Sequence, residues 1–291
     1  MFDFSRRDRC PVCSASGGRC LYDEAFDAGR TRKFLETYYQ SRLDVGRLAR
    51  GRYSVLCCDG CGLYYQRDTL TGAGEIHLYE EAISAESSLR KREDSGYAYF
   101  RSLLRDAEVI RDLVPGERPR AIEVLDFGMG WGHWTFAAKA LGHSAWGAEL
   151  SPRRVEFAAA SGVRIAELNQ MPDGFFDYIN SDQVLEHVTC LREVTALVAR
   201  LLKPGGVLKV FVPDGSRLGR VLGPAYQPAK DAIQPLEHVN GFTRASLDRL
   251  MADFGLYRIP PSGFASTGRR LHWLARGLTR RQAPDGYFRK Q

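Results

Sequence analysis

The stretch Leu125-Asp126-Phe127-Gly128-Met129-Gly130-Trp131-Gly132 joins an apolar run to three closely spaced glycines. The apolar residues 121–127 predict a buried strand, and residues 133–141 predict a helix that ends at Gly142. Glycines let a ligand approach the backbone closely, and the start of a helix offers N–H groups that have no partner within the helix. The stretch therefore predicts a ligand site at the carboxyl end of a strand.

Strands and helices alternate along the rest of this region. Further strands are expected at 144–148, 176–180 and 207–212, and a helix at 185–202. This order predicts an α/β fold whose parallel sheet is covered by helices on both faces. Glu149 follows the second strand, where a carboxylate can accept hydrogen bonds from ribose hydroxyls. The spacing Gly-x-Gly-x-Gly differs from the Gly-x-Gly-x-x-Gly of dinucleotide dehydrogenases.

Four segments, in this order along the chain, resemble motifs of class I S-adenosylmethionine-dependent methyltransferases. They are the glycine stretch 125–132, Gly147-Ala148-Glu149-Leu150-Ser151, the segment 176–188 that contains Val184-Leu185-Glu186-His187-Val188, and Leu202-Lys203-Pro204-Gly205-Gly206-Val207-Leu208. Gly241-Phe242-Thr243 and residues 247–251 extend the match. The resemblance implies a Rossmann-like sheet, S-adenosylmethionine as cofactor and a methyl-transferring enzyme.

The resemblance also implies which residues contact the cofactor. Asp126 would orient its amino group, Glu149 would hold the ribose, and Leu168 would lie beside the adenine. The full implied set is Asp126, Gly128, Met129, Gly130, Glu149, Leu150, Leu168, Asn180 and Ser181. The alternatives are a helix cap for Asp126 and a surface carboxylate for Glu149. Met129 and Trp131 are large for a glycine loop, and we expect them to narrow the pocket.

Two Cys-x-x-Cys pairs lie near the amino terminus. Their four thiolates, from Cys10, Cys13, Cys58 and Cys61, are a tetrahedral ligand set that suits zinc. Residues 53–56 and 63–65 are expected to form strands around the second pair, with Gly62 allowing the turn and a helix inserted over 32–48. Iron in the same four-cysteine site, or reduced thiols that merely pack, remain alternatives. The pairs resemble the zinc-ribbon-like domain of some sugar and natural-product methyltransferases.

Methyl transfer from a sulfonium is an in-line displacement, so most of the catalysis is alignment, and an acceptor that must lose a proton also needs a base. His238, in Glu237-His238-Val239-Asn240-Gly241, is the first candidate, since a Glu-His pair occupies a similar place in zinc-containing sugar methyltransferases. The alternative for His238 is a bond that braces the helix start near Thr243. His187 is the second candidate, with an architectural or cofactor-adjacent role as its alternative.

The expected organisation has four parts. Residues 1–70 form the zinc-binding domain, 71–120 a helical connector, 121–265 the cofactor-binding domain and 266–291 a basic tail. Within the connector, residues 86–113 predict an amphipathic helix that packs on the sheet. The zinc-binding domain has no separate flexible linker, so we expect it to dock on the main domain.

The charge pattern bears on the partners. The net charge is +6, and residues 266–291 carry seven basic residues against one acid, while the remaining chain is balanced at 34 of each. A small-molecule acceptor, such as a sugar or natural product, is the favoured substrate, with the acceptor atom left open among O, N and C. The alternatives are an RNA methyltransferase that uses the ribbon and the basic tail, and a non-catalytic cofactor-binding protein. A broad basic face for nucleic acid is absent from the pattern.

No apolar run reaches the roughly 20 residues that span a bilayer, and the first ten residues do not resemble a secretory signal, so we expect a cytoplasmic protein without membrane contact.

Overall fold

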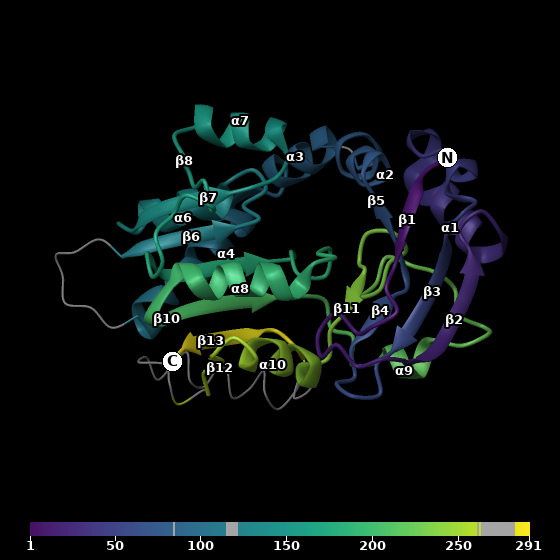
Figure 1. Cartoon of the computed structure of the whole chain (residues 1–291). Helices are drawn as coiled ribbons and strands as arrows, with labels where there is room; N and C mark the ends of the chain where they lie inside the picture. Colours follow the sequence, from purple (N-terminus) through teal and green to yellow (C-terminus); the bar gives the residue numbers. More distant parts are fainter. Residues whose placement is uncertain (84, 115–121, 261, 263–282) are drawn as a thin grey trace.

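The protein consists of a large α/β part and a smaller amino-terminal module, placed side by side (Figure 1). The structure, a computed structural model, describes residues 1–83, 85–114, 122–260, 262 and 283–291. Among these residues no helix is both long and apolar enough to serve as a membrane span.

A seven-stranded sheet forms the centre of the large part. Its order is β12 (Leu256–Arg258), β13 (Gly286–Lys290), β10 (Leu202–Phe211), β9 (Phe176–Asp182), β6 (Glu123–Phe127), β7 (Ser144–Ala148) and β8 (Arg164–Ile165). The strands β10, β9, β6, β7 and β8 are parallel neighbours, whereas β13 is antiparallel to both β10 and β12. The sheet continues from β6 with β7 and β8 on one side and with β9 and β10 on the other. Because these strands are parallel, the carboxyl ends of β6, β7 and β9 lie beside one another.

Alternate residues of the central strands support different helix layers, as the period of two requires. Val124, Tyr178 and Val207 face a layer made of α4 (Gly96–Ala107), α5 (Ile110–Leu113) and α6 (His133–Ala140). Leu125, Ile179 and Leu208 face the opposite layer, made of α8 (Leu191–Leu201) and α10 (Arg244–Ala252). Helix α7 (Pro152–Ala160) covers the glycine stretch and β8. The expected α/β sheet with helices on both faces is confirmed.

The amino-terminal module has two small sheets. One contains β11 (Asn240–Gly241), β4 (Tyr64–Gln66), β3 (Arg52–Cys57) and β2 (Arg19–Ala25), and the other pairs β1 (Asp3–Arg6) with β5 (Asp68–Thr71). Helix α1 (Gly29–Tyr39) is followed by the 3-10 turns Gln40–Arg42 and Val45–Leu48. The core of the module also takes in residues 218–236, which include the short helix α9 (Leu218–Val221). The module is therefore discontinuous, and the range 1–70 does not contain all of it.

Two of the expected helices differ in extent from the structure. The expected helix over 86–113 is divided into α3 (Ala85–Glu93), α4 and α5, because Gly96 adopts a positive φ of 64° between the first two. It is preceded by α2 (Ala73–His77) and a π turn at Leu78–Ala82. The helix expected from residue 185 begins at Leu191, because Asn240 captures carbonyl groups of the preceding loop.

The carboxyl-terminal residues differ from the expected basic tail. Residues 286–290 form β13 inside the sheet, where Phe288 is fully buried. Arg289 donates hydrogen bonds to the carbonyls of Gly205 and Leu113, and the Lys290 ammonium bonds the carbonyl of Leu202. Two of the seven basic residues of the tail thus serve the fold. The other five basic residues lie outside the described residues, as do Leu271, Leu274, Ala275 and Leu278, whose spacing in the sequence is that of one face of a helix.

Asn240 joins the module to the large part, as the expected docking requires. Its fully buried side chain donates to the carbonyls of Leu185 (2.9 Å) and Val188 (2.7 Å) and accepts from Arg7 Nη1 (2.9 Å). Its backbone N–H donates to the carbonyl of Glu186 (3.0 Å). One side chain therefore satisfies polar groups from the amino-terminal module and from the loop that follows β9.

We expect Asn240→Ala to lower the free energy of unfolding by about 2–4 kcal/mol, because the change leaves two buried carbonyls and one guanidinium N–H without their partner. Urea unfolding measures the change. The exposed Asn169 is a matched control, and Asn169→Ala should shift stability by no more than about 0.5 kcal/mol. Equal stability of the two variants would show that Asn240 is not the link described here.

Candidate functional site

The residues expected to bind the cofactor gather where β6, β7 and β9 end. Asp126 is paired in register with Gly147 on one side and Asn180 on the other, and Phe127 is paired with Ala148 and Ser181. The parallel sheet thus brings together residues that lie far apart in the sequence. This edge is where ligands bind in open α/β sheets.

The glycine stretch folds over the end of β7. The N–H groups of Gly128 and Met129 both donate to the carbonyl of Ala148 (2.9 and 3.0 Å). Gly128 has a positive φ of 77°, and a Cβ there would lie 2.5 Å from Val184 Cγ2, so only glycine fits between the loop and the segment after β9. A Cβ at Gly130 would meet nothing within 4 Å, although its φ is 55°. The loop is therefore open to a ligand at Gly130.

Glu149 is tied to this loop and is not a free surface carboxylate. Its Oε2 accepts from the N–H of Gly130 (3.0 Å), and its Oε1 accepts from the N–H groups of Leu150 (2.8 Å) and Ser151 (3.1 Å). The carboxylate is thereby fixed beside the open glycine with acceptor capacity left. Leu150, next in the chain, is 97% exposed. An exposed apolar side chain beside a fixed carboxylate suits a flat ring attached to a ribose.

Asp126 is a buried acid, 3% exposed. Its Oδ1 accepts from Asn180 Nδ2 (2.7 Å) and its Oδ2 from the Thr135 hydroxyl (3.1 Å). Burial raises the pKa of this carboxyl to about 7, while the two hydrogen bonds offset part of the rise. The group on α6 that donates to Asp126 is the Thr135 hydroxyl and not a backbone N–H group, so Asp126 does not cap that helix. It orients Asn180 and anchors α6 beneath the glycine loop.

Two polar atoms next to Asp126 have no hydrogen-bond partner among the described residues. They are Asn180 Oδ1 and Ser181 Oγ, both buried at the end of β9. Buried polar atoms without partners are uncommon and call for a ligand or water. An acceptor and a hydroxyl at this position fit the ammonium and carboxylate of an amino-acid group. The donor set is therefore compatible with the methionine part of S-adenosylmethionine.

The side chain of Met129 is not in the opening, which corrects the expectation that it narrows the pocket. It is buried with Ala158 and Val163, and its sulfur occupies the space that a Cβ at Gly147 would take. The absence of a side chain at Gly147 admits this packing. Trp131 is also buried, edge-on to Phe157. Only the backbone of Met129 remains available to a cofactor.

Leu168 lies in the loop after β8, partly buried against the sheet core. Its carbonyl accepts from Arg200 Nη2 (3.0 Å), and Arg200 also bonds the carbonyl of Met171 and the carboxylate of Asp173. Arg200 on α8 thus holds the whole loop in place. The expected place of Leu168 beside the adenine stays a prediction.

The structure places His187 and His238 in contact. Their rings lie 4.9 Å apart and nearly perpendicular. His187 Nδ1 is 2.9 Å from the carbonyl of Glu237, and His238 Nδ1 is 2.5 Å from the carbonyl of Asp231. A carbonyl only accepts, so each Nδ1 carries the proton and each Nε2 keeps its lone pair. Burial lowers the pKa of both imidazoles, that of His187 to about 4 with a contribution from His238.

His238 does not brace the helix start near Thr243. Helix α10 has its own capping box, in which Thr243 Oγ1 accepts from the Ser246 N–H (3.2 Å) and Ser246 Oγ accepts from the Thr243 N–H (3.0 Å). The Nδ1 of His238 is engaged with Asp231 instead. The ring is therefore free to act at Nε2.

Glu186 is a site residue that the sequence reasoning quoted only as part of a motif. It is fully buried, and neither carboxylate oxygen has a hydrogen-bond partner among the described residues. Burial raises the pKa of this carboxyl to about 8. Oε1 lies 3.9 Å from His187 Nε2. An acid next to a candidate histidine was the available signal, but its burial was not visible in the sequence.

The four cysteines converge as the paired motifs predict. The Sγ atoms of Cys10 and Cys61 are 3.6 Å apart, those of Cys13 and Cys58 are 3.5 Å apart, and all four lie within 4.8 Å of one another. A disulfide would need about 2.05 Å, whereas four sulfurs around zinc at about 2.3 Å are separated by about 3.8 Å. The spacing fits a tetrahedral metal site.

Both turns that carry the cysteines have the same backbone geometry. Ser14 and Gly62, each directly after the second cysteine of its pair, have φ of 58° and 74°. Their N–H groups donate to the carbonyls of Cys10 and Cys58, both at 2.9 Å. The expected role of Gly62 in the turn is confirmed. Cys10 and Cys58 are buried in the same core as α8 and α10, so the site lies at the junction with the large part.

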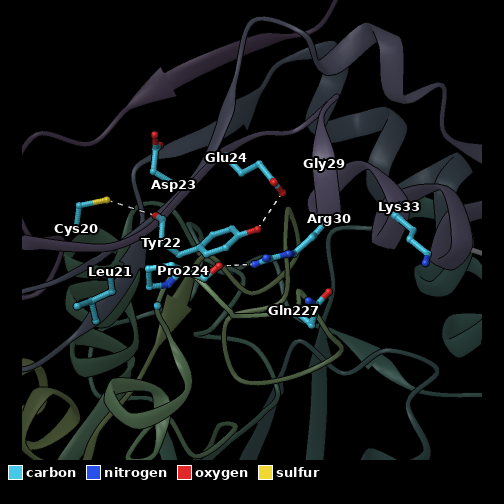
Figure 2. Close-up of a pocket in the computed structure, with 11 residues that line it drawn as sticks. Cys20, Leu21, Tyr22, Asp23, Glu24, Gly29, Arg30, Lys33, Pro224 and Gln227 are labelled. Carbon is cyan, nitrogen blue, oxygen red and sulfur yellow. Dashed lines mark hydrogen bonds between the residues drawn. The ribbon is translucent and has the colours of Figure 1, made fainter.

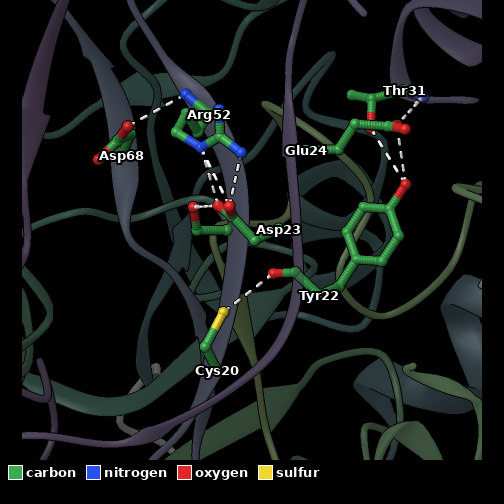
Figure 3. A network of polar contacts seen from close by, with 8 residues as sticks. Cys20, Tyr22, Asp23, Glu24, Thr31, Arg52 and Asp68 are labelled. Atoms are coloured by element: carbon green, nitrogen blue, oxygen red, sulfur yellow. Dashed lines mark hydrogen bonds and ion pairs between the residues drawn. The ribbon is translucent and has the colours of Figure 1, made fainter. Parts of the chain in front are cut away.

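A separate cavity of about 700 Å³ lies on the module, between β2, α1 and the segment near Pro224 (Figure 2). Arg30 bonds the carbonyl of Pro224, and the Tyr22 hydroxyl donates to Glu24 (2.9 Å). Behind this wall Arg52 holds Asp23 through two nitrogens and lowers the pKa of that carboxyl, while the Arg52 N–H bonds Asp68 (Figure 3). Arg52 thus joins β2, β3 and β5, and Arg30 joins α1 to the segment near Pro224.

The methyltransferase domain family matches residues 97–259, more than half of the chain. Among solved structures, the chain is similar to the 1,6-didemethyltoxoflavin-N1-methyltransferase of Burkholderia thailandensis, with 17% identity over 82% of this chain and 95% of that one and a TM-score of 0.44. It is also similar to CalS10, an amino pentose methyltransferase of Micromonospora echinaspora involved in calicheamicin biosynthesis (26% identity, 45% and 59% coverage, TM-score 0.34). It spans 66% of the length of the PH0226 protein of Pyrococcus horikoshii (22% identity, 43% of this chain, TM-score 0.33). No curated protein matches the chain.

The family match begins in α4, contains the glycine stretch, Glu149 and the segment of Glu186 and His187, and extends past His238 to the end of β12. It therefore covers every element that forms the carboxyl edge described above. The chain belongs to the methyltransferase domain family and is a class I S-adenosylmethionine-dependent methyltransferase.

Proposed function

We propose that this enzyme methylates a small-molecule acceptor, such as a sugar or natural product, at a hydroxyl group that His238 deprotonates. The observation that carries the proposal is the His187/His238 pair, oriented by backbone carbonyls and placed beside the cofactor loop. Val184 packs on Gly128 in that loop, and His187 follows three residues later. A base oriented in this way serves an acceptor that must lose a proton, as a hydroxyl group does.

The cofactor-binding part of the proposal assigns one role to each group at the carboxyl edge. Glu149 accepts from the ribose hydroxyls, Leu150 and Leu168 cover the adenine, and the backbone at Gly128–Gly130 contacts the amino-acid part. Asn180 and Ser181 bind that part through their unpartnered atoms. Asp126 acts through Asn180, whose Nδ2 donates to its Oδ1. S-adenosylmethionine supplies an activated methyl group, so the protein's task is alignment of the acceptor.

The role proposed for His238 depends on which of its two ring nitrogens carries no proton. With Nδ1–H of His238 held by the Asp231 carbonyl, Nε2 is the atom that takes the proton from the acceptor hydroxyl. His187 is held in the same tautomer by Glu237 and packs against His238, so it fixes the position of that ring. Burial keeps both imidazoles neutral near pH 7, because it lowers their pKa. A neutral imidazole is the form that accepts a proton.

A small molecule is preferred over RNA because the basic residues that the structure describes near the carboxyl terminus are used internally. Arg289 and Lys290 bond backbone carbonyls of the large part. Arg192 and Arg7, at the junction with the module, likewise bond the carbonyls of Val12 and Gln66. Donors engaged in this way do not contribute to phosphate contacts.

The four cysteines complete the proposal as a structural zinc site. A closed set of four thiolates leaves no open position for a substrate, which is typical of structural and not catalytic zinc. The site lies between the module and the large part. Thr243 Oγ1 at the start of α10 bonds the Gly62 carbonyl (3.4 Å), and Arg192 on α8 bonds the Val12 carbonyl (2.8 Å). Zinc would therefore stabilise the docked arrangement.

The substrate class is tested with a panel of hydroxyl-bearing sugars, sugar nucleotides and aromatic natural products, with transfer RNA and ribosomal RNA as the contrast. Formation of S-adenosylhomocysteine is the readout. We expect turnover with at least one small hydroxyl compound and none with RNA. Methylation of RNA, with no turnover of any small compound, would contradict the proposal.

We expect Glu149→Ala to weaken S-adenosylmethionine binding by roughly 2–4 kcal/mol, measured by calorimetry. The variant loses the charged acceptor for the ribose and also the hydrogen bond that positions Gly130. The exposed Glu156 on α7 provides the control, and Glu156→Ala should bind the cofactor as the parent does. Parental affinity in Glu149→Ala would place the ribose elsewhere.

We expect His238→Ala to lower kcat by about 10²–10⁴-fold on the acceptor found in the panel, the usual contribution of a general base. Cofactor affinity, measured on the same preparation, should stay within about twofold of the parent, because the ring bonds Asp231 and not the cofactor loop. His143→Ala serves as a control for loss of a buried histidine on the far side of α6. Unchanged kcat in folded His238→Ala protein would remove His238 from the reaction.

We expect one tightly held zinc per chain after extensive dialysis, as determined by elemental analysis. Cys58→Ser should lose this metal and lower the melting temperature, because metal binding and folding are coupled at such sites. Cys190→Ser, which alters an exposed cysteine, should retain both metal and stability. A parent protein without zinc or iron would show that the four thiols only pack.

A further inference from the structure

We propose that Glu186, His187 and His238 form a second metal site, which binds one divalent transition ion of the zinc or cobalt type. Their ligand atoms lie within 4.8 Å of one another, and the site is distinct from the four cysteines. Two imidazoles and one carboxylate are the donor set that such ions accept with positions left for other ligands. The inference concerns the cluster to which the proposed function already assigns the base.

The two histidines are oriented as metal ligands usually are. In most metal sites a ligating imidazole donates its other N–H to a carbonyl or carboxylate, which fixes the tautomer and the ring. Here the carbonyls of Glu237 and Asp231 fulfil this function for His187 and His238. Both Nε2 lone pairs are therefore preset before any ion arrives. The perpendicular rings, 4.9 Å apart, do not obstruct each other.

Glu186 provides an independent reason to expect an ion. Its side chain is 0% exposed, and neither oxygen has a hydrogen-bond partner among the residues that the structure describes. A histidine that acts only as a base does not require such a carboxyl group, and burial of a polar group without a hydrogen-bond partner costs free energy. A cation bound by Glu186, His187 and His238 would satisfy it. The carboxylate is 3.9 Å from His187 Nε2, on the side of the free lone pair.

The three ligand atoms must move slightly closer together to bind one ion. Two donors at about 2.1 Å from a tetrahedral ion lie about 3.4 Å apart, so the pairs at 3.9 Å and beyond must approach by about 0.5–1.4 Å. The backbone around them is held by Asn240, whose N–H bonds the Glu186 carbonyl. The adjustment falls to the side-chain torsions of Glu186 for its two pairs, and to those of His187 and His238 for the pair of imidazoles.

Proton transfer to His238 and binding of the ion compete for one atom. The lone pair of His238 Nε2 either takes the acceptor's proton or binds the ion. If His238 is the base, as the proposed function states, an ion at this site inhibits methyl transfer reversibly. This consequence rests on the proposed function, whereas binding of the ion does not.

Binding is tested on full-length protein dialysed until it holds one zinc per chain, so that only the four-cysteine site is filled, and Co²⁺ is then added as the probe. We expect isothermal calorimetry to show one further Co²⁺ per chain. The absence of thiolate-to-cobalt absorption should show that the four-cysteine site has kept its zinc. Glu186→Gln, which preserves shape, and His187→Ala should each weaken this second event by at least about 100-fold, since loss of even an outer-shell partner weakens binding 10–100-fold.

The surface pair His77–Glu81, with Nδ1 and Oε2 2.9 Å apart, offers a matched control. His77→Ala should leave the second event unchanged. The affinity of each variant for S-adenosylmethionine verifies that the large part is folded. A parent protein that binds no Co²⁺ beyond its zinc would overturn the proposal, and so would binding that survives both Glu186→Gln and His187→Ala.

Turnover in the presence of Co²⁺ separates the two proposals. Inhibition that follows the occupancy of the second site supports both of them. Binding of Co²⁺ with unchanged or increased turnover supports the metal site and overturns the assignment of His238 as the base. Loss of turnover in His238→Ala, together with no binding of Co²⁺ by the parent, supports the base and overturns the metal site.

Discussion

The hydrogen bonds of Asn240 are the constraint on which the arrangement of the site depends. This buried residue connects the loop after β9, the strand β4 of the amino-terminal module and the segment that carries His238. Without it, residues 185–188 would have carbonyls available to continue a helix toward α8. Because Asn240 captures those carbonyls, the chain stays irregular there, and Glu186 and His187 are presented at the edge of the sheet beside His238.

Hydrogen bonds to backbone groups also orient the residues of the proposed site. Both imidazoles are fixed by carbonyls of residues 231–237, and Glu149 is fixed by three N–H groups around the glycine loop. Backbone groups move little, so these contacts hold the site ready before substrate binds. Preorganisation of this kind is the main contribution a methyltransferase makes, because its cofactor already carries an activated methyl group.

The parts of the fold that follow local patterns were predictable from the sequence. The strand before the glycine loop, the second strand before Glu149 and the cysteine turns each carry their signal within a few neighbouring residues. Two kinds of feature were not predictable. Strand β13 is inserted between β10 and β12, which lie earlier in the chain, and its arginine and lysine bond carbonyls that no local pattern reveals. The packing of Met129 under Gly147 and the isolation of Glu186 depend on residues brought together only by the sheet.

The module affects the site through its position, although none of its cysteines reaches the carboxyl edge. Its strand β4 pairs with β11, which immediately follows His238 and Val239, and Arg7 bonds the carbonyls of Val239 and Gln66. Gln66 in turn bonds the carbonyls of Gln234 and His238. The segment from 234 to 241 is therefore held by the module on one side and by the Glu186 loop on the other. Because the four cysteines bring two turns of this module together at its junction with the large part, a metal bound there would rigidify the support of His238 without taking part in the chemistry.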